Sequence, residues 1–175
     1  MSQHSYVSPF REHHPRIEED VYVDVSARII GNVILQGGSA VWPGAVLRGD
    51  DASVYVAERT MIMDHVLLEG PLGHSVILEK EVIVSHKACI HGAVIGTGAF
   101  IGIGAIILEG VEVGEYSLIG PGAVIPPGTK IPARSVVVGH PAKIIREISS
   151  VEIETIRHQH DHLVRKAQEY RQLIV

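Results

Sequence analysis

Branched apolar residues recur at every sixth position along most of the chain. Stepping by six from Ile95 to Val137 reaches only isoleucine or valine. A small residue often stands four positions later, as at Ala99 and Ala105, and glycine often follows the apolar residue directly, as at Gly96. A fixed period of six predicts a repeat in which each hexad supplies one short strand and one tight corner.

This repeat predicts an all-β fold, a left-handed parallel β-helix of hexapeptide repeats. Each coil contains three hexads, or 3 × 6 = 18 residues. The apolar residue of each hexad points inward, and glycine tolerates the positive φ that some corners need. An ordinary β-sandwich with glycine-rich turns is the alternative, but its strands would alternate apolar and polar residues with a period of two. The sustained period of six excludes that alternative.

The six-residue register breaks three times in the first part of the repeat. The step lengthens to nine residues after Leu47 and to ten after Leu68, and it shortens to five after Ile90. Insertions in a solenoid form loops that gather on one face, which is often the binding face. We therefore expect a functional site in the segment that these breaks enclose.

The repeat divides the chain into three parts. We expect an N-terminal extended cover over residues 1–19, the β-helix over residues 20–147, and a C-terminal α-helix packed on its outside over residues 148–175. Ser149 and Glu152 have the spacing of a capping box, in which each side chain accepts a hydrogen bond from the other residue's backbone N–H. Apolar residues from Ile153 to Ile174 then recur at roughly helical spacing.

Composition and charge narrow the classes of function. Apolar residues make up 46% of the chain and charged residues 20%, so a sizeable core is available and disorder is excluded. The net charge of −5 argues against nucleic acid or an anionic membrane as a partner. The single cysteine suits a reducing compartment, and we expect no secretory signal and no membrane span. A cytoplasmic protein is therefore expected.

Several conspicuous side chains are expected to have no chemical role. His158, His160 and His162 alternate along the predicted helix and cannot share one of its faces, so we expect all three to be solvated. Trp42 is expected at the surface or at an interface. Cys89 precedes an inward-facing apolar position and is expected to be inert packing rather than a nucleophile.

Two coils flank the ten-residue step and bring polar residues into register. Aligning them places Asp64 beside His86 and Glu69 beside His91, since 86 − 64 = 22 and 91 − 69 = 22. Glu69 and His91 are therefore expected side by side on one face. His86 lies five residues earlier, on a different edge, and we expect it to reach the corresponding pair of a neighbouring subunit.

This region resembles the γ-class carbonic anhydrase family. The resemblance rests on Leu47–Asp50, which reads Leu-Arg-Gly-Asp, on Asp64, and on the stretch from Ser85 to Gly92 with its two histidines. It extends over about residues 10–147 and includes the Gly-His-Pro-Ala-Lys ending at Gly139–Lys143, which many hexapeptide acyltransferases share. The resemblance implies a homotrimer with a metal ion at each subunit interface.

The resemblance also implies a set of metal ligands. Glu69 and His91 would come from one subunit and His86 from the next. Two histidines and one carboxylate suit a divalent metal, foremost zinc, with iron or cobalt as alternatives. His65 and His74 are further candidates for the metal shell, although we expect both to be exposed to solvent.

The implied activity is hydration of CO₂, and dehydration of bicarbonate, by a metal-bound hydroxide. The candidate catalytic residues are Glu69, Arg48, Asp50 and Asp64, and the last three match an interface network of salt bridges in the family. This chain has Glu69 where the family has its third histidine ligand, and Met63 where it has a glutamine. The proton-shuttle loop of the family is absent as well. A carboxylate makes the metal a poorer Lewis acid, so a weak or lost activity is expected.

Two other functions are left open by the residues. An acyl-CoA-dependent hexapeptide acyltransferase would use His86 or His91 as a general base without a metal. A non-catalytic assembly or binding subunit would use the trimer only as a scaffold. The fold does not decide among these functions, because one scaffold hosts several chemistries.

Overall fold

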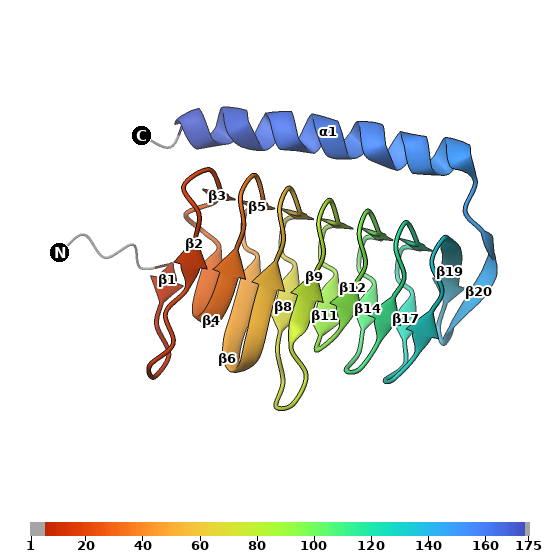
Figure 1. Ribbon diagram of the computed structural model, residues 1–175, viewed down its shortest axis with the longest axis horizontal. Helices are drawn as coiled ribbons and strands as arrows, with labels where there is room; N and C mark the ends of the chain where they lie inside the picture. Colours follow the sequence, from red (N-terminus) through yellow and green to blue (C-terminus); the bar gives the residue numbers. More distant parts are fainter. Residues whose placement is uncertain (1–5, 174–175) are drawn as a thin grey trace.

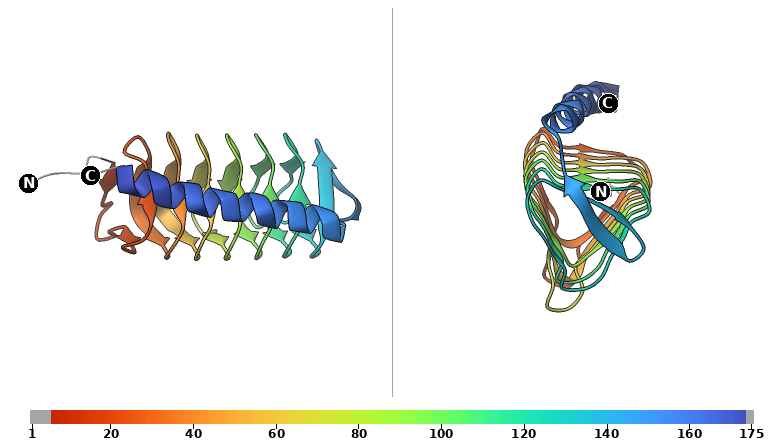
Figure 2. Two further views of the ribbon diagram at one scale, coloured as in Figure 1. Left: turned by 90° about the horizontal axis from the view of Figure 1, so that it is seen from above. Right: turned by 90° about the vertical axis from the view of Figure 1, so that its right-hand side faces the viewer.

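Residues 6–173, which the computed structural model describes, form a three-sided coil of short parallel strands with one long helix along its outside (Figure 1). Seen along the coil axis, successive coils superpose as a triangle (Figure 2). Residues 1–5 and 174–175, at the ends of the predicted N-terminal cover and C-terminal helix, lie outside the described residues. The predicted all-β coil with an external C-terminal helix is confirmed.

Stacking of the strands produces three faces. The first face contains β3 (Tyr22–Val23), β5 (Ala40–Val41), β7 (Met61–Ile62), β10 (Ile83–Val84), β13 (Phe100–Ile101), β16 (Leu118–Ile119) and β19 (Ser135–Gly139), and β20 (Ala142–Glu147) pairs with β19. The second face contains β1 (Val7–Ser8), β8 (Leu67–Glu69), β11 (Cys89–His91), β14 (Ile106–Ile107) and β17 (Val124–Ile125). The third face contains β2 (Arg16–Ile17), β9 (Val76–Leu78), β12 (Val94–Ile95), β15 (Glu112–Val113) and β18 (Lys130–Ile131).

Two long strands join the second and third faces. Strands β4 (Arg28–Leu35) and β6 (Val46–Val56) each begin on the second face and end on the third. The first part of β6 pairs with β8, and its last part pairs with β9. The nine-residue step in the repeat is thus absorbed by a strand that continues around a corner.

Inward-facing aliphatic side chains form one continuous column. Leu47, Leu68, Ile90 and Ile107 follow one another in register on the second face, and each is completely buried. Burying one such side chain stabilises a fold by about 1.5–3 kcal/mol. The column therefore holds the corners, and the polar residues that they carry, in fixed positions.

The C-terminal helix α1 (Ser150–Leu173) covers the first face. Its buried side chains Leu163, Val164 and Ala167 pack against outward-facing residues of β3 and β7. No helix within residues 6–173 is long and apolar enough to span a membrane. Figure 2 shows α1 on one side of the coil, and the other two faces carry no helix within the described residues.

Two sequence predictions fail beneath this helix. Trp42 is only 4% exposed and lies between Tyr22 and Tyr170, with ring centroids 5.6 and 5.2 Å away. His160, expected to be solvated, is also 4% exposed and bonds to the backbone carbonyl of Arg59. Both predictions are wrong because α1 packs on the first face: the helix covers Trp42, and its own His160 faces the coil. The strand pattern does not show where the helix will pack.

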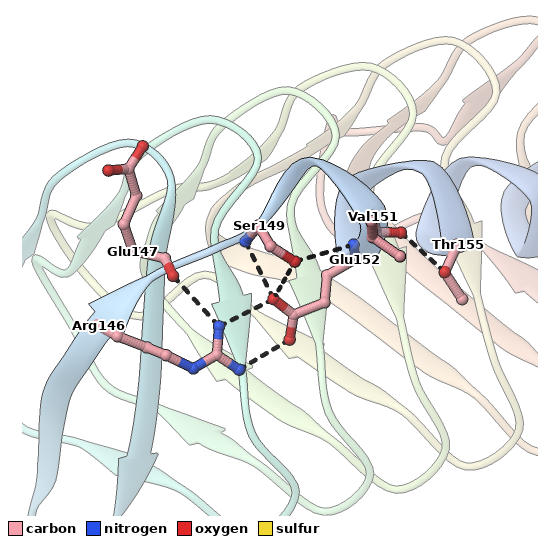
Figure 3. A network of polar contacts seen from close by, with 6 residues as sticks. All are labelled: Arg146, Glu147, Ser149, Val151, Glu152 and Thr155. Carbon is pink, nitrogen blue, oxygen red and sulfur yellow. Dashed lines mark hydrogen bonds and ion pairs between the residues drawn. The ribbon is translucent and has the colours of Figure 1, made fainter.

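The predicted capping box is present at the start of α1 (Figure 3). The backbone N–H of Glu152 donates to Ser149 Oγ at 3.2 Å, and the backbone N–H of Ser149 donates to the Glu152 carboxylate at 3.0 Å. Arg146 donates two further bonds to this carboxylate, at 2.7 and 2.8 Å. Arg146, followed by Ser149, holds the pKa of Glu152 well below its usual value.

Loss of this cap should destabilise the protein measurably. We expect Ser149→Ala to lower the free energy of unfolding by about 1 kcal/mol, because it leaves a helix N-terminal N–H without its acceptor. Urea unfolding followed by circular dichroism measures the change. Ser150→Ala, the same substitution one residue further along, is the matched control. Equal losses in the two variants would contradict a capping role.

Candidate functional site

A row of polar side chains runs along one edge of the second face. Backbone register pairs Arg48 of β6 with Glu69 of β8, and Glu69 in turn with His91 of β11. The predicted pairing of Glu69 with His91 is therefore confirmed. His91 Nε2 lies 3.9 Å from Glu69 Oε1, so these two groups face each other across neighbouring strands.

The carboxylate of Glu69 is bound by a cation of the chain. Arg48 Nη2 donates to Glu69 Oε1 in a close ion pair. The Nε atom of Arg48 also lies 3.3 Å from Asp50 Oδ1, on the same strand. The guanidinium therefore lies between two carboxylates, and the negative charge of Glu69 is locally neutralised.

His91 has a second carboxylate on its other ring nitrogen. Its Nδ1 lies 3.4 Å from Glu109 Oε2. A backbone N–H bond within Glu109 itself, followed by His91 and His74, lowers the pKa of Glu109. The sequence reasoning did not single out this residue, although its spacing was a usable signal, because 109 − 91 = 18 is one full coil. Because Glu109 contacts the Nδ1 atom of His91, the Nε2 atom is the one that faces Glu69.

His86 shows the same arrangement at the corner before β11. Its Nδ1 lies 2.9 Å from Asp64 Oδ2, so the predicted stacking of Asp64 with His86 is confirmed. The ring is half-buried, and its Nε2 is left for another group. A carboxylate on one nitrogen and a free second nitrogen is typical of metal-ligating histidines. It is also typical of histidines that act as general bases.

The two histidines do not meet within one chain. His86 precedes β11 and His91 ends it, so the two residues occupy opposite edges of the second face. Within residues 6–173, no group of three or more histidine, cysteine, aspartate or glutamate side chains is placed to hold a metal ion. Each chain therefore presents two separate parts of the candidate site, with the second face between them.

The surface between these two parts is apolar. The outward-facing side chains along it are Val46, Leu67, Cys89, Ile106 and Val124, all of them half-buried or exposed. Burial, with a smaller contribution from Glu69, raises the pKa of the Cys89 thiol, which disfavours the nucleophilic thiolate. The third face differs, since it carries the ion pair of Glu112 and Lys130.

The remaining candidates lie at the margins of this surface. His65 is exposed at the corner beside Asp64, where its ring lies against Gly44 of the preceding coil. His74 is exposed in the loop between β8 and β9 and packs against Gly92, whose φ of +67° and tight contact exclude a side chain there. Met63 is buried under α1 and does not belong to the second face.

Comparison with known proteins decides the family. The model "Bacterial transferase hexapeptide (six repeats)" matches residues 92–127. The chain is 42% identical over 165 residues to the Bacillus subtilis protein YtoA, named as an uncharacterized transferase, and the match covers 94% of this chain and 96% of YtoA. It is 32% identical over 167 residues to a carbonic anhydrase of Geobacillus kaustophilus, covering 95% and 92% of the two chains. The chain belongs to the γ-carbonic anhydrase-like family of hexapeptide-repeat proteins.

A solved structure supports the family's fold. A Bacillus cereus protein described as a candidate acetyltransferase superposes with a TM-score of 0.94 at 32% identity, covering 95% of this chain and 97% of that one. The predicted left-handed β-helix is therefore confirmed. The family thus includes proteins named as carbonic anhydrases and proteins named as acyl-group transferases, so the activity has to be argued from the site.

Proposed function

We propose that this γ-carbonic anhydrase-like chain forms a homotrimer with a divalent metal site at each interface. Glu69 and His91 of one copy and His86 of the next would hold the metal, and the site would hydrate CO₂. One observation carries the proposal: both histidines have a carboxylate on Nδ1 and lie at opposite edges of an uncovered apolar face. Packing that face against a second copy would bring the two edges together and bury the apolar row.

The donor set fits a divalent metal. Two imidazole nitrogens and one carboxylate oxygen suit zinc, and they also suit iron or cobalt. The 3.9 Å between His91 Nε2 and Glu69 Oε1 leaves space for an ion bound to both. A bound divalent ion would supply a Lewis acid that lowers the pKa of water to near neutrality.

The chain's own residues would orient and tune this site. Asp64 and Glu109 would fix the rings of His86 and His91, so that each directs Nε2 toward the interface. The apolar row would exclude bulk water and suit an apolar substrate such as CO₂. Glu69 adds a negative charge where a histidine would be neutral, so we expect slower hydration than in relatives with three histidines.

Three measurements on the unaltered protein test the proposal. Light scattering should give a trimer, and metal analysis should give about one divalent ion per chain, as one site at each interface of a closed trimer requires. Stopped-flow CO₂ hydration should be slower than for the Geobacillus kaustophilus carbonic anhydrase assayed alongside. A monomer, or a trimer that stays metal-free after incubation with zinc, would contradict the proposal. A rate equal to that of the carbonic anhydrase would contradict the role given to Glu69.

A second candidate function rests on the pair of His86 and Asp64. A histidine held at Nδ1 by a carboxylate is the arrangement of a general base, which an acyltransferase needs to activate an acceptor hydroxyl or amine. The similarity to a candidate acetyltransferase favours the same activity. Absence of metal together with thermal stabilisation by coenzyme A would support an acyltransferase. Absence of both would leave a non-catalytic assembly or binding subunit, and a cytoplasmic location fits all three functions.

A further inference from the structure

The Glu69 oxygen that faces His91 is already bound by Arg48. Oε1 of Glu69 is the atom 3.9 Å from His91 Nε2, and it is also the acceptor of the ion pair with Arg48 Nη2. A metal ion joining Glu69 to His91 would use this oxygen. The guanidinium would then lie within a few ångströms of a dication, and at that distance two positive charges repel strongly in a half-buried site.

Arg48 has a second carboxylate within reach. Its Nε lies 3.3 Å from Asp50 Oδ1, and within residues 6–173 neither of these two buried atoms has a hydrogen-bond partner. Arg48 and Asp50 are two positions apart on β6, so both side chains project from the same side of the strand. A small change of side-chain rotamer would therefore release Glu69 and keep the guanidinium on Asp50.

We propose that Arg48 controls metal occupancy of the site by competing for Glu69. Without metal its guanidinium lies between Glu69 Oε1 and Asp50, and in the metal-loaded protein it pairs with Asp50 alone. This inference rests on the proposed metal site. If Arg48 only stabilised the interface, its removal would weaken metal binding. If Arg48 competes with the metal for Glu69, its removal strengthens metal binding.

Zinc affinity of the full-length protein, measured by chelator competition, separates the two roles. Arg48→Gln should bind zinc about twofold to fivefold more tightly than the unaltered chain, as expected for loss of one partly exposed ion pair. Asp50→Asn should bind zinc more weakly, because Arg48 loses its alternative partner. Arg28→Gln is the matched control, since Arg28 lies on the same face in the preceding coil and its loss changes the net charge equally. The control should leave the affinity unchanged.

A direct measurement does not depend on any variant assembling. Crystal structures of the unaltered protein, grown with a chelator and with zinc, should show the guanidinium of Arg48 on both Glu69 and Asp50 in the first and on Asp50 alone in the second. A guanidinium that stays on Glu69 in the zinc-loaded protein would overturn the inference. So would an Arg48→Gln variant that remains trimeric and binds zinc no more tightly than the unaltered chain.

The outcomes distinguish this inference from the proposed function. Tight zinc binding by the unaltered chain, with weaker binding by Arg48→Gln trimers, would support the proposed metal site and refute the competition. No zinc binding by either protein would refute both proposals. Zinc binding by Arg48→Gln, but not by the unaltered chain, would support the competition and contradict the proposed function of the unaltered chain.

Discussion

Mixed trimers of His86→Ala and His91→Ala chains are expected to recover metal binding that each variant alone has lost. A site across an interface needs His91 from one copy and His86 from the next, so each variant by itself has no intact site. In a random one-to-one mixture, an interface has both histidines with a probability of ½ × ½, about one quarter. Metal analysis of trimers assembled from a one-to-one mixture, without selection for their composition, measures this recovery.

A control variant, and a result that would contradict a shared metal site, accompany the mixing experiment. His65→Ala removes an exposed histidine at the corner beside Asp64 and should leave metal content unchanged. Recovery well below one quarter, with trimers intact, would show that the two histidines do not share an ion across the interface. Full binding by either variant alone would show that its histidine is no ligand.

Replacement of Glu69 by histidine is expected to raise both zinc affinity and CO₂ hydration, each by about tenfold or more, the size of effect that changes around a metal site typically have. A neutral imidazole leaves the metal one charge unit more positive and therefore a stronger Lewis acid. It also removes the carboxylate that Arg48 occupies. Chelator competition and stopped-flow hydration measure the two effects.

A variant that keeps only a weak ligand atom tests the reason for this gain. Glu69→Gln removes the negative charge and supplies only a weak amide oxygen, so we expect it to bind zinc less tightly than the unaltered chain. A gain in Glu69→Gln equal to that in Glu69→His would show that loss of charge, and not the new ligand, is responsible. No gain in Glu69→His would show that the site is not of the proposed type.

The six-residue period was sufficient to predict the coil and much of the site. The inward column and the corners follow from the repeat, because every hexad places its apolar residue at the same point of a coil. Counting along that register placed Glu69 beside His91 and Asp64 beside His86, and both pairings are present. The capping box of Ser149 was equally local, since it depends on a spacing of three residues.

Contacts between side chains on different coils were harder to predict. Arg48 was expected in an interface network with Asp50 and Asp64, and within one copy it pairs with Glu69 as well as with Asp50. The nine-residue step after Leu47 interrupts the six-residue period, so counting by sixes does not pair Arg48 of β6 with Glu69 of β8. Glu109 lies one coil beyond His91, and the orientation of the histidine ring decides that they meet.

The sequence by itself determined the repeat, the corners and the residues that share a strand edge, because these depend on spacing along the chain. The tertiary structure alone decided that α1 buries Trp42 and His160, and that Arg48 binds Glu69. Those contacts depend on the packing of distant segments and on the rotamers of long side chains, which no local period specifies.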